Sequence, residues 1–218
     1  MKSTRITITL VAIVLALIGG GASVVFLWGI YTRHWDGNVT NSIVRSVLVP
    51  AARVGKRTIL YRDYLDSVKS IEIFLQSPEA VAQGVNRELL IADQKSAFDR
   101  LLEEAALEEL AVVRNINISD EQIAQFTQLA INDFAGQSGK TAADIEPYLM
   151  ETYGWTLAHF QKHIVRPALL TRLLMTSFSV DHPDDPVALD VYIEKRLAEQ
   201  DIVRYVKFPA DLPAAPTT

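Results

Sequence analysis

The sequence predicts a mainly α-helical fold class, with an N-terminal transmembrane helix followed by a helical domain that carries a small β-sheet. Three observations lead to this prediction. No charged side chain occurs over the 26 positions from Ile6 to Tyr31. Apolar residues then recur at helical spacing over most of residues 62–199. Two short β-rich stretches, 51–61 and 202–208, flank those helices. Because a lone strand leaves its backbone groups unpaired, we expect these stretches to form one sheet.

The first element is the apolar segment that begins at Ile6 and ends at Tyr31. As a helix it would rise about 39 Å, enough to cross a hydrocarbon core of about 30 Å. Fourteen of its residues are Ile, Leu, Val or Phe, and together they favour insertion by about 4–8 kcal/mol. A cleaved signal peptide is the alternative, with its apolar region at 6–18. Because apolar sequence resumes at Val24, the pattern favours an uncleaved anchor.

The charges beside the anchor indicate its orientation. Lys2 and Arg5 favour a cytoplasmic N-terminus, so we expect residues 1–5 as a cytoplasmic tip and the body outside the cytoplasm. Arg33 and Arg45 lie on the other side and weaken this preference. Small residues at positions 12, 16 and 20 have a spacing that can pack two anchors together, and small residues facing lipid are the alternative.

Composition excludes several classes of protein. The chain has 218 residues and no cysteine, which excludes disulfide-stapled domains, Cys-ligated metal sites, thiol enzymes and lipoproteins anchored through a lipidated Cys. Residues 32–218 hold 19 basic and 26 acidic side chains, a net charge of −7. Because affinity for nucleic acid depends on neutralising phosphates, this acidic body argues against a nucleic-acid partner.

The elements after the anchor begin with a connector over residues 32–50, whose short amphipathic stretch could lie on the membrane or pack on the domain. Residues 51–61 predict a hairpin about Gly55-Lys56 that pairs with 202–208. This sheet would close a domain over 51–208. The ending, 209–218, is rich in Pro, Ala and Thr and predicts a disordered tail.

The helices follow from spacing and caps. We expect helices over about 62–76 and 85–114, then one capped by Ser119 with Gln122, a short one over about 142–152 after a loop at 136–140, and a last one over about 187–199. A further helix is expected between those at 142–152 and 187–199, because Gly154 suits the end of one helix and Thr156 the start of the next. The helix that starts after Thr156 presents Leu157, Phe160, Ile164 and Ala168 on one face, and Pro167 predicts a kink in it.

Two groups of polar residues resemble reactive sites, and both favour a solvated surface instead. The acidic run Glu103, Glu104, Glu108 and Glu109 has no His or metal ligand converging on it in the sequence pattern. His159 and His163 stand four residues apart, but both are expected to point away from the apolar face of their helix. We therefore expect no metal site.

No cofactor or catalytic motif is complete. Residues 136–141 end like a phosphate-binding loop, but Phe134 stands where that motif requires Gly, and the segment follows a helix instead of a strand. No nucleophile elbow or dinucleotide loop occurs. We expect neither a cofactor nor catalysis.

Several motifs resemble, in their order, the N-terminal chaperone domain of the SurA, PrsA and PpiD group. They are Pro50 to Ile59 before a helix, a long helix running into Asn117-Ile118-Ser119-Asp120-Glu121-Gln122-Ile123, and Tyr153-Gly154-Trp155-Thr156 leading to Phe160 and Val165-Arg166-Pro167. The resemblance covers roughly residues 50–175. A membrane-anchored start is similar to the PpiD type. The family's parvulin prolyl isomerase domain is not recognisable in residues 176–218, so no catalytic residue carries over.

The resemblance implies a membrane-tethered, non-enzymatic chaperone of the cell envelope that binds unfolded exported proteins. It sits in the cytoplasmic membrane as a single-pass protein, with the bilayer as its second partner. Client-facing candidates are Tyr153, Trp155 and Phe160, for which packing in the domain's own core is the alternative. An adaptor of an envelope complex and a prolyl isomerase relative whose catalytic domain is missing are the other functional hypotheses.

Overall fold

The computed structural model of the chain describes residues 23, 25–35, 37–138, 140–181, 188–198 and 202–208. The chain divides into two units, Val49–Arg204 and Met1–Leu48 with Tyr205–Thr218. Most of the predicted anchor, residues 6–22 and 24, lies outside the described residues, as does the predicted tail at 209–218. Among the residues that are described, no helix has both the length and the hydropathy needed to cross a membrane.

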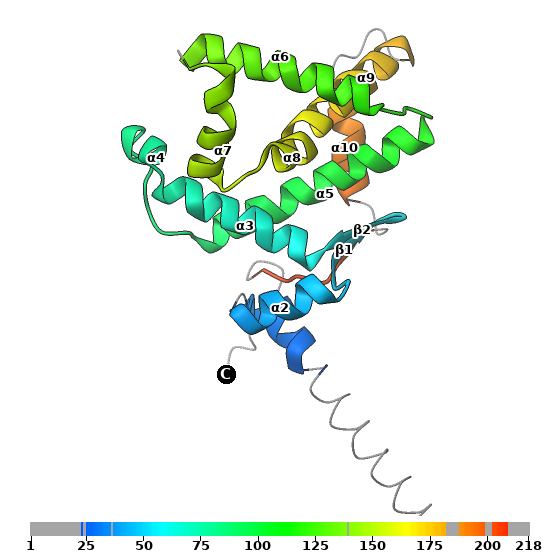
Figure 1. Cartoon of the computed structure of the whole chain (residues 1–218). Coiled ribbons are helices and arrows are strands. Elements are labelled where there is room, and N and C mark those ends of the chain that lie inside the picture. The colour runs from blue at the N-terminus through cyan, green and yellow to red at the C-terminus, as the bar shows by residue number, and fades with distance from the viewer. Residues whose placement is uncertain are drawn as a thin grey trace, which may run out of the picture. The chain divides into compact units, whose positions relative to one another are not determined.

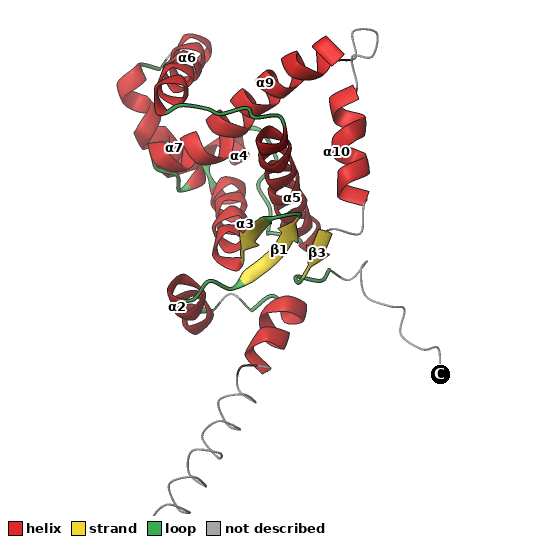
Figure 2. Cartoon of the chain, turned by 90° about the vertical axis from the view of Figure 1, so that its right-hand side faces the viewer, coloured by secondary structure: helices red, strands yellow, loops and turns green. Residues whose placement is uncertain are grey.

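The larger unit begins with the predicted sheet. Strands β1 (Pro50–Val54) and β2 (Arg57–Leu60) form an antiparallel hairpin, and β3 (Ile202–Arg204) pairs antiparallel with the other edge of β1. Gly55 in the turn has a φ of +53°, a conformation that glycine adopts without strain. The first and last strands of the unit therefore lie side by side, as predicted, with α5 packed on the sheet (Figure 2).

The third strand is shorter than predicted. Pairing with β1 ends at Arg204, and residues 205–208 belong to the smaller unit. There the Lys207 amide donates to the Tyr31 carbonyl at 2.8 Å, and Val206 and Phe208 are buried. Because this backbone bonds elsewhere, it does not extend the β-ladder.

Helices α3 (Tyr61–Gln76), α4 (Pro78–Ala82) and α5 (Ile91–Val113) follow the hairpin. The long helix predicted from residue 85 instead begins at Ile91, and Leu90 is exposed. The cause is local: the Leu90 amide donates to the Asp93 carboxylate at 2.8 Å, a cap that starts the helix there. The apolar spacing in the sequence predicts that Leu90, Ala97, Phe98, Leu101, Leu102 and Ala105 share one buried side, and all of these except Leu90 are buried.

The rest of the unit is helical (Figure 1). It comprises α6 (Asp120–Ser138), the 3₁₀ turn η1 (Ala142–Asp144), α7 (Ile145–Tyr153), α8 (Leu157–Phe160), the π-helical turn η2 (Gln161–Val165), α9 (Arg166–Asp181) and α10 (Ala188–Ala198). The predicted caps at Ser119 and Thr156 both form. The loop predicted at 136–140 is shorter, since α6 continues to Ser138.

The π turn overturns the predicted face of the kinked helix. Arg166 donates its amide to the Gln161 carbonyl, five residues back, just before Pro167, which has no amide hydrogen. Because this turn holds one residue more than an α-helical turn, the side chains that follow it are rotated around the helix axis. Ile164 and Ala168 are therefore exposed, while Val165 and Leu169 are buried. A core of Leu107, Leu110, Leu174, Phe178 and Leu189 joins α5, α9 and α10.

In the smaller unit, residues 25–33 are helical and α2 spans Asn38–Ser46. Its parts are tied together through Tyr31, whose ring stacks on Tyr205 at 5.7 Å, and through His34, which contacts Phe208 at 4.9 Å. Of the amphipathic connector, Val44 is buried and Val39 is exposed.

Candidate functional site

The three client-facing candidates come together in one apolar cluster. Its buried members are Ile145, Leu149 and Trp155, and partly buried side chains pack against them: Ile131, Phe134, Tyr153 and Phe160. The cluster forms where α7 ends. Gly154 adopts the left-handed φ of +68° that terminates the helix, and Thr156 caps α8 immediately afterwards. This sharp turn brings side chains from α6, α7 and α8 onto one core.

Trp155 and its two neighbours differ in accessibility. The Trp155 side chain is 8% exposed, and its indole N–H donates to the Ser70 hydroxyl, which is also buried. Tyr153 and Phe160 are only partly buried. Trp155 is thus part of the domain's packing in this structure, while the other two lie at the margin of the cluster. Their role in client binding stays a prediction.

An aromatic row connects these residues. Phe134 contacts Tyr148 at 4.9 Å between ring centroids, Tyr148 contacts Tyr153 at 6.3 Å, and Tyr153 stacks on Trp155 at 5.0 Å. Tyr153 also stacks on Phe74 of α3 at 5.5 Å. Burial, together with Tyr148, raises the pKa of Tyr153 to about 12. The phenol is neutral at physiological pH, as an unshifted tyrosine also is, and acts as apolar surface with a polar edge.

A small apolar cavity of about 50 Å³ opens beside this row, lined by Ala130, Ile131, Phe134, Ile145, Tyr148, Leu149 and Phe160. We call these seven residues the apolar cleft. Of the predicted site residues, only Phe160 lines it. The apolar spacing of residues 142–152 indicates only Ile145 and Leu149, but Tyr148 stands three residues from Ile145 and thus on the same side of the helix.

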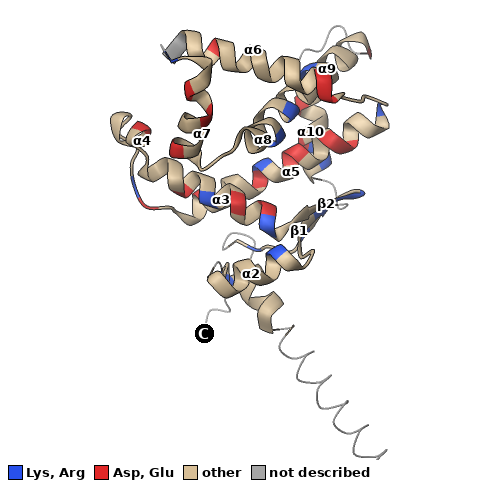
Figure 3. Ribbon diagram, viewed as in Figure 1, with Lys and Arg blue, Asp and Glu red and all other residues tan. Residues whose placement is uncertain are grey.

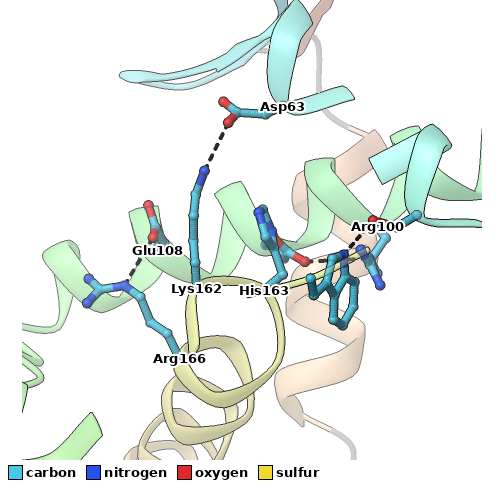
Figure 4. A network of polar contacts seen from close by, with 9 residues as sticks. Asp63, Arg100, Glu108, Lys162, His163 and Arg166 are labelled. Atoms are coloured by element: carbon cyan, nitrogen blue, oxygen red, sulfur yellow. Dashed lines mark hydrogen bonds and ion pairs between the residues drawn. The ribbon is translucent and has the colours of Figure 1, made fainter. Parts of the chain in front are cut away.

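A second feature is a polar network between α5 and the π turn. Lys162 donates to Asp63 of α3 at 2.9 Å, Arg166 to Glu108 at 3.3 Å, and His163 lies 3.4 Å from Glu104 (Figure 4). All of these side chains except Arg166 line a cavity of about 150 Å³. Two predictions are therefore wrong: His163 is buried, and the acidic run on α5 is not a solvated face.

The reason is again the π turn, which rotates His163 inward while His159 stays exposed. Glu104 also pairs with Arg100, Glu108 with Arg57, and Glu109 with Arg196, so only Glu103 is exposed as predicted. Figure 3 shows both acidic and basic residues along the ribbon of α5. The pairs with Arg57 of β2, Arg166 of α9 and Arg196 of α10 link α5 to its neighbours, whereas the pair with Arg100 lies within α5. Within the described residues, no group of three or more His, Asp or Glu is arranged to hold a metal ion.

Comparison with known proteins agrees with this fold. The family model of the SurA-like N-terminal domain matches residues 1–174, well over half of the chain. Searches among curated proteins and among solved structures give no match. The family match also covers the hairpin, the long helix and the aromatic turn on which the resemblance rests. This chain therefore belongs to the family of SurA-like N-terminal domains.

Proposed function

We propose that this protein is a membrane-anchored extracytoplasmic chaperone that binds unfolded exported polypeptides without catalysis. The family supports the chaperone relationship. The single observation that carries the proposal is the apolar cleft, since an unfolded chain exposes scattered hydrophobic side chains that such a surface can shield from water.

The chemistry of the cleft suits this role. Its cavity, about 50 Å³, is far smaller than the 300–1,000 Å³ typical of small-molecule sites. Phe134, Tyr148 and Phe160 line it and are each partly exposed, so their ring edges can extend the contact beyond the cavity. Such a surface takes single apolar or aromatic side chains of many sequences, because only Tyr148 among the seven lining side chains carries a polar group. Tyr153 lies beside it, and Trp155 supports it from within.

The anchor sets where the protein would act. The uncharged run from Ile6 to Tyr31 supports a single-pass helix in the cytoplasmic membrane, and the charges before it support a cytoplasmic N-terminus. The body would then meet chains as they leave the membrane. Protease added to intact cells, with the outer membrane permeabilised if there is one, should remove a C-terminal tag; protection of the tag would contradict this topology.

Site-specific crosslinking tests client binding. The photoreactive residue p-benzoylphenylalanine is placed at Tyr148, in the cleft, or at Leu129, an exposed apolar position of α6 outside it. The full chain in nanodiscs is mixed with reduced, denatured lysozyme and irradiated. We expect crosslinks from position 148 at least several-fold above those from position 129. Equal yields, or failure of the chain at several-fold excess to delay aggregation of the client, would contradict the proposal.

The same material separates the other hypotheses. One stoichiometric crosslinked partner in cells, in place of a broad mixture, would favour an adaptor. Faster cis-to-trans exchange of an X-Pro peptide than the uncatalysed tens of seconds would favour an isomerase.

A further inference from the structure

The smaller unit exposes an apolar face on α2 (Asn38–Ser46). We define the α2 apolar face as Val39, Ile43 and the C-cap residue Val47, which recur every four residues and therefore share one side of the helix. Val39 is 73% exposed and Val47 55%. The buried side of the helix is formed by Thr40 and Val44 instead. The α2 apolar face is thus a surface that the fold of the chain leaves open to solvent.

Charge and aromatic content distinguish this unit from the rest of the chain. Residues 1–48 and 205–218 together hold five basic side chains and two acidic ones, Asp36 and Asp211, a net charge of +3. The larger unit, residues 49–204, holds 16 basic and 24 acidic side chains, a net charge of −8. Trp28 and Trp35 are both exposed in the smaller unit. Exposed Trp beside basic residues is typical of segments that lie at a membrane surface.

We infer that α2 lies in the interfacial region of an anionic phospholipid bilayer, with the α2 apolar face against the acyl chains. This inference rests on the proposed anchor. Only six residues separate Tyr31, where the uncharged run ends, from Asn38, where α2 begins. Even fully extended, they hold α2 within about 25 Å of the end of the anchor. The basic side chains of the unit complement anionic headgroups, and the net negative charge of the larger unit is repelled by them.

The chain is well suited to a direct test because it has no cysteine. Single-cysteine variants Val39→Cys and Val47→Cys carry a bimane label, and the full chain is reconstituted into nanodiscs of anionic lipid with or without brominated acyl chains. Asn38→Cys is the matched control, since Asn38 is exposed but lies about 100° or more around the helix from each member of the α2 apolar face. We expect brominated lipid to quench the labels at 39 and 47 at least twofold more than the label at 38.

The outcomes separate this inference from the anchor itself. If the chain does not co-elute with nanodiscs, the proposed anchor fails. If it co-elutes but the three labels are quenched equally, α2 does not lie in the bilayer and the inference is overturned. Pyrene excimer emission from position 39, without bromine quenching, would also overturn it, because a second copy would then cover the face. In neutral lipid we expect weaker quenching; undiminished quenching there would refute the preference for anionic headgroups.

Discussion

The hydrogen bond from Trp155 to Ser70 makes the core of the aromatic turn testable. Both side chains are buried, and the Ser70 hydroxyl in turn donates to the Asp66 carbonyl at 3.0 Å. Trp155→Phe removes the indole donor and part of a buried ring, which should cost about 1–3 kcal/mol. Ser70→Ala leaves the buried indole N–H unpaired, which should also cost about 1–3 kcal/mol.

The double variant isolates the bond. Because removing both partners leaves no orphaned donor, the double variant should be less destabilised than the sum of the single variants by about 0.5–1.5 kcal/mol. The assay is urea unfolding of the full chain in mild detergent, followed by far-ultraviolet circular dichroism so that the loss of Trp does not affect the signal. A loss of about 2 kcal/mol corresponds to a midpoint shift of about 1 M urea.

Trp28→Phe is the matched control, since that indole is exposed, and its stability should change by no more than about 0.5 kcal/mol. If Trp155→Phe behaves like the control, or if the two core substitutions are additive within about 0.3 kcal/mol, then Trp155 is not held in the core. The division of the candidate residues into a supporting Trp155 and an accessible cleft would then be refuted.

Three further predictions concern a helix end, an ion pair and the core. Gly154→Ala should destabilise by more than Gly84→Ala: both sites have a φ of +68°, which costs about 1–2 kcal/mol, but only at 154 would the new Cβ clash, with Ile73. Urea unfolding compares the two variants. Hydrogen bonds from Arg87 lower the pKa of Asp93 below its usual 3.8. Because the folded-state pKa is lowered, this stabilisation is present above pH 3.8 and is lost as pH falls through the folded value. The midpoint temperature of thermal unfolding should therefore fall less on acidification in Asp93→Asn than in the unaltered chain. Leu174→Ala, at a site 0% exposed, should cost about 2–5 kcal/mol in urea unfolding.

Three results would contradict these expectations. Equal losses at the two glycines would show that the contact with Ile73 is relieved at no cost. Identical acid profiles would show that the Arg87 pair does not persist in solution. A loss below about 1 kcal/mol in the Leu174 variant would place that residue outside the core joining α5, α9 and α10.

Local patterns predicted most of the larger unit. The turn glycine at 55 acts through its own backbone conformation, and Ser119, Thr156 and Gly154 act through bonds to residues a few positions away. Such interactions can be recognised from sequence because the partners are neighbours in the chain. The same reasoning correctly expected the apolar face of α5, where spacing alone identifies the buried side.

Two features that regular sequence patterns do not reveal, an irregular helical turn and a contact between distant helices, explain the errors at the candidate sites. A single π turn between Phe160 and Arg166 shifted the phase of the following helix, so that His163 turned inward to Glu104 and Ile164 turned outward. A prediction from spacing assumes a regular α-helix, so it cannot anticipate the residue that a π turn adds. The apolar cleft was missed for a related reason, since its α6 and α7 side chains meet only when two segments of the chain pack.

The sequence by itself determined the family and the mainly helical fold class, because these depend on order, composition and short-range bonding; the anchor stays a prediction from the same sequence. Only the tertiary structure decided which aromatic side chains are buried and which stay accessible, how the acidic residues of α5 are paired, and which side of α2 is left uncovered. Those properties depend on which distant elements pack together, and burial is a property of that packing and not of the residue alone.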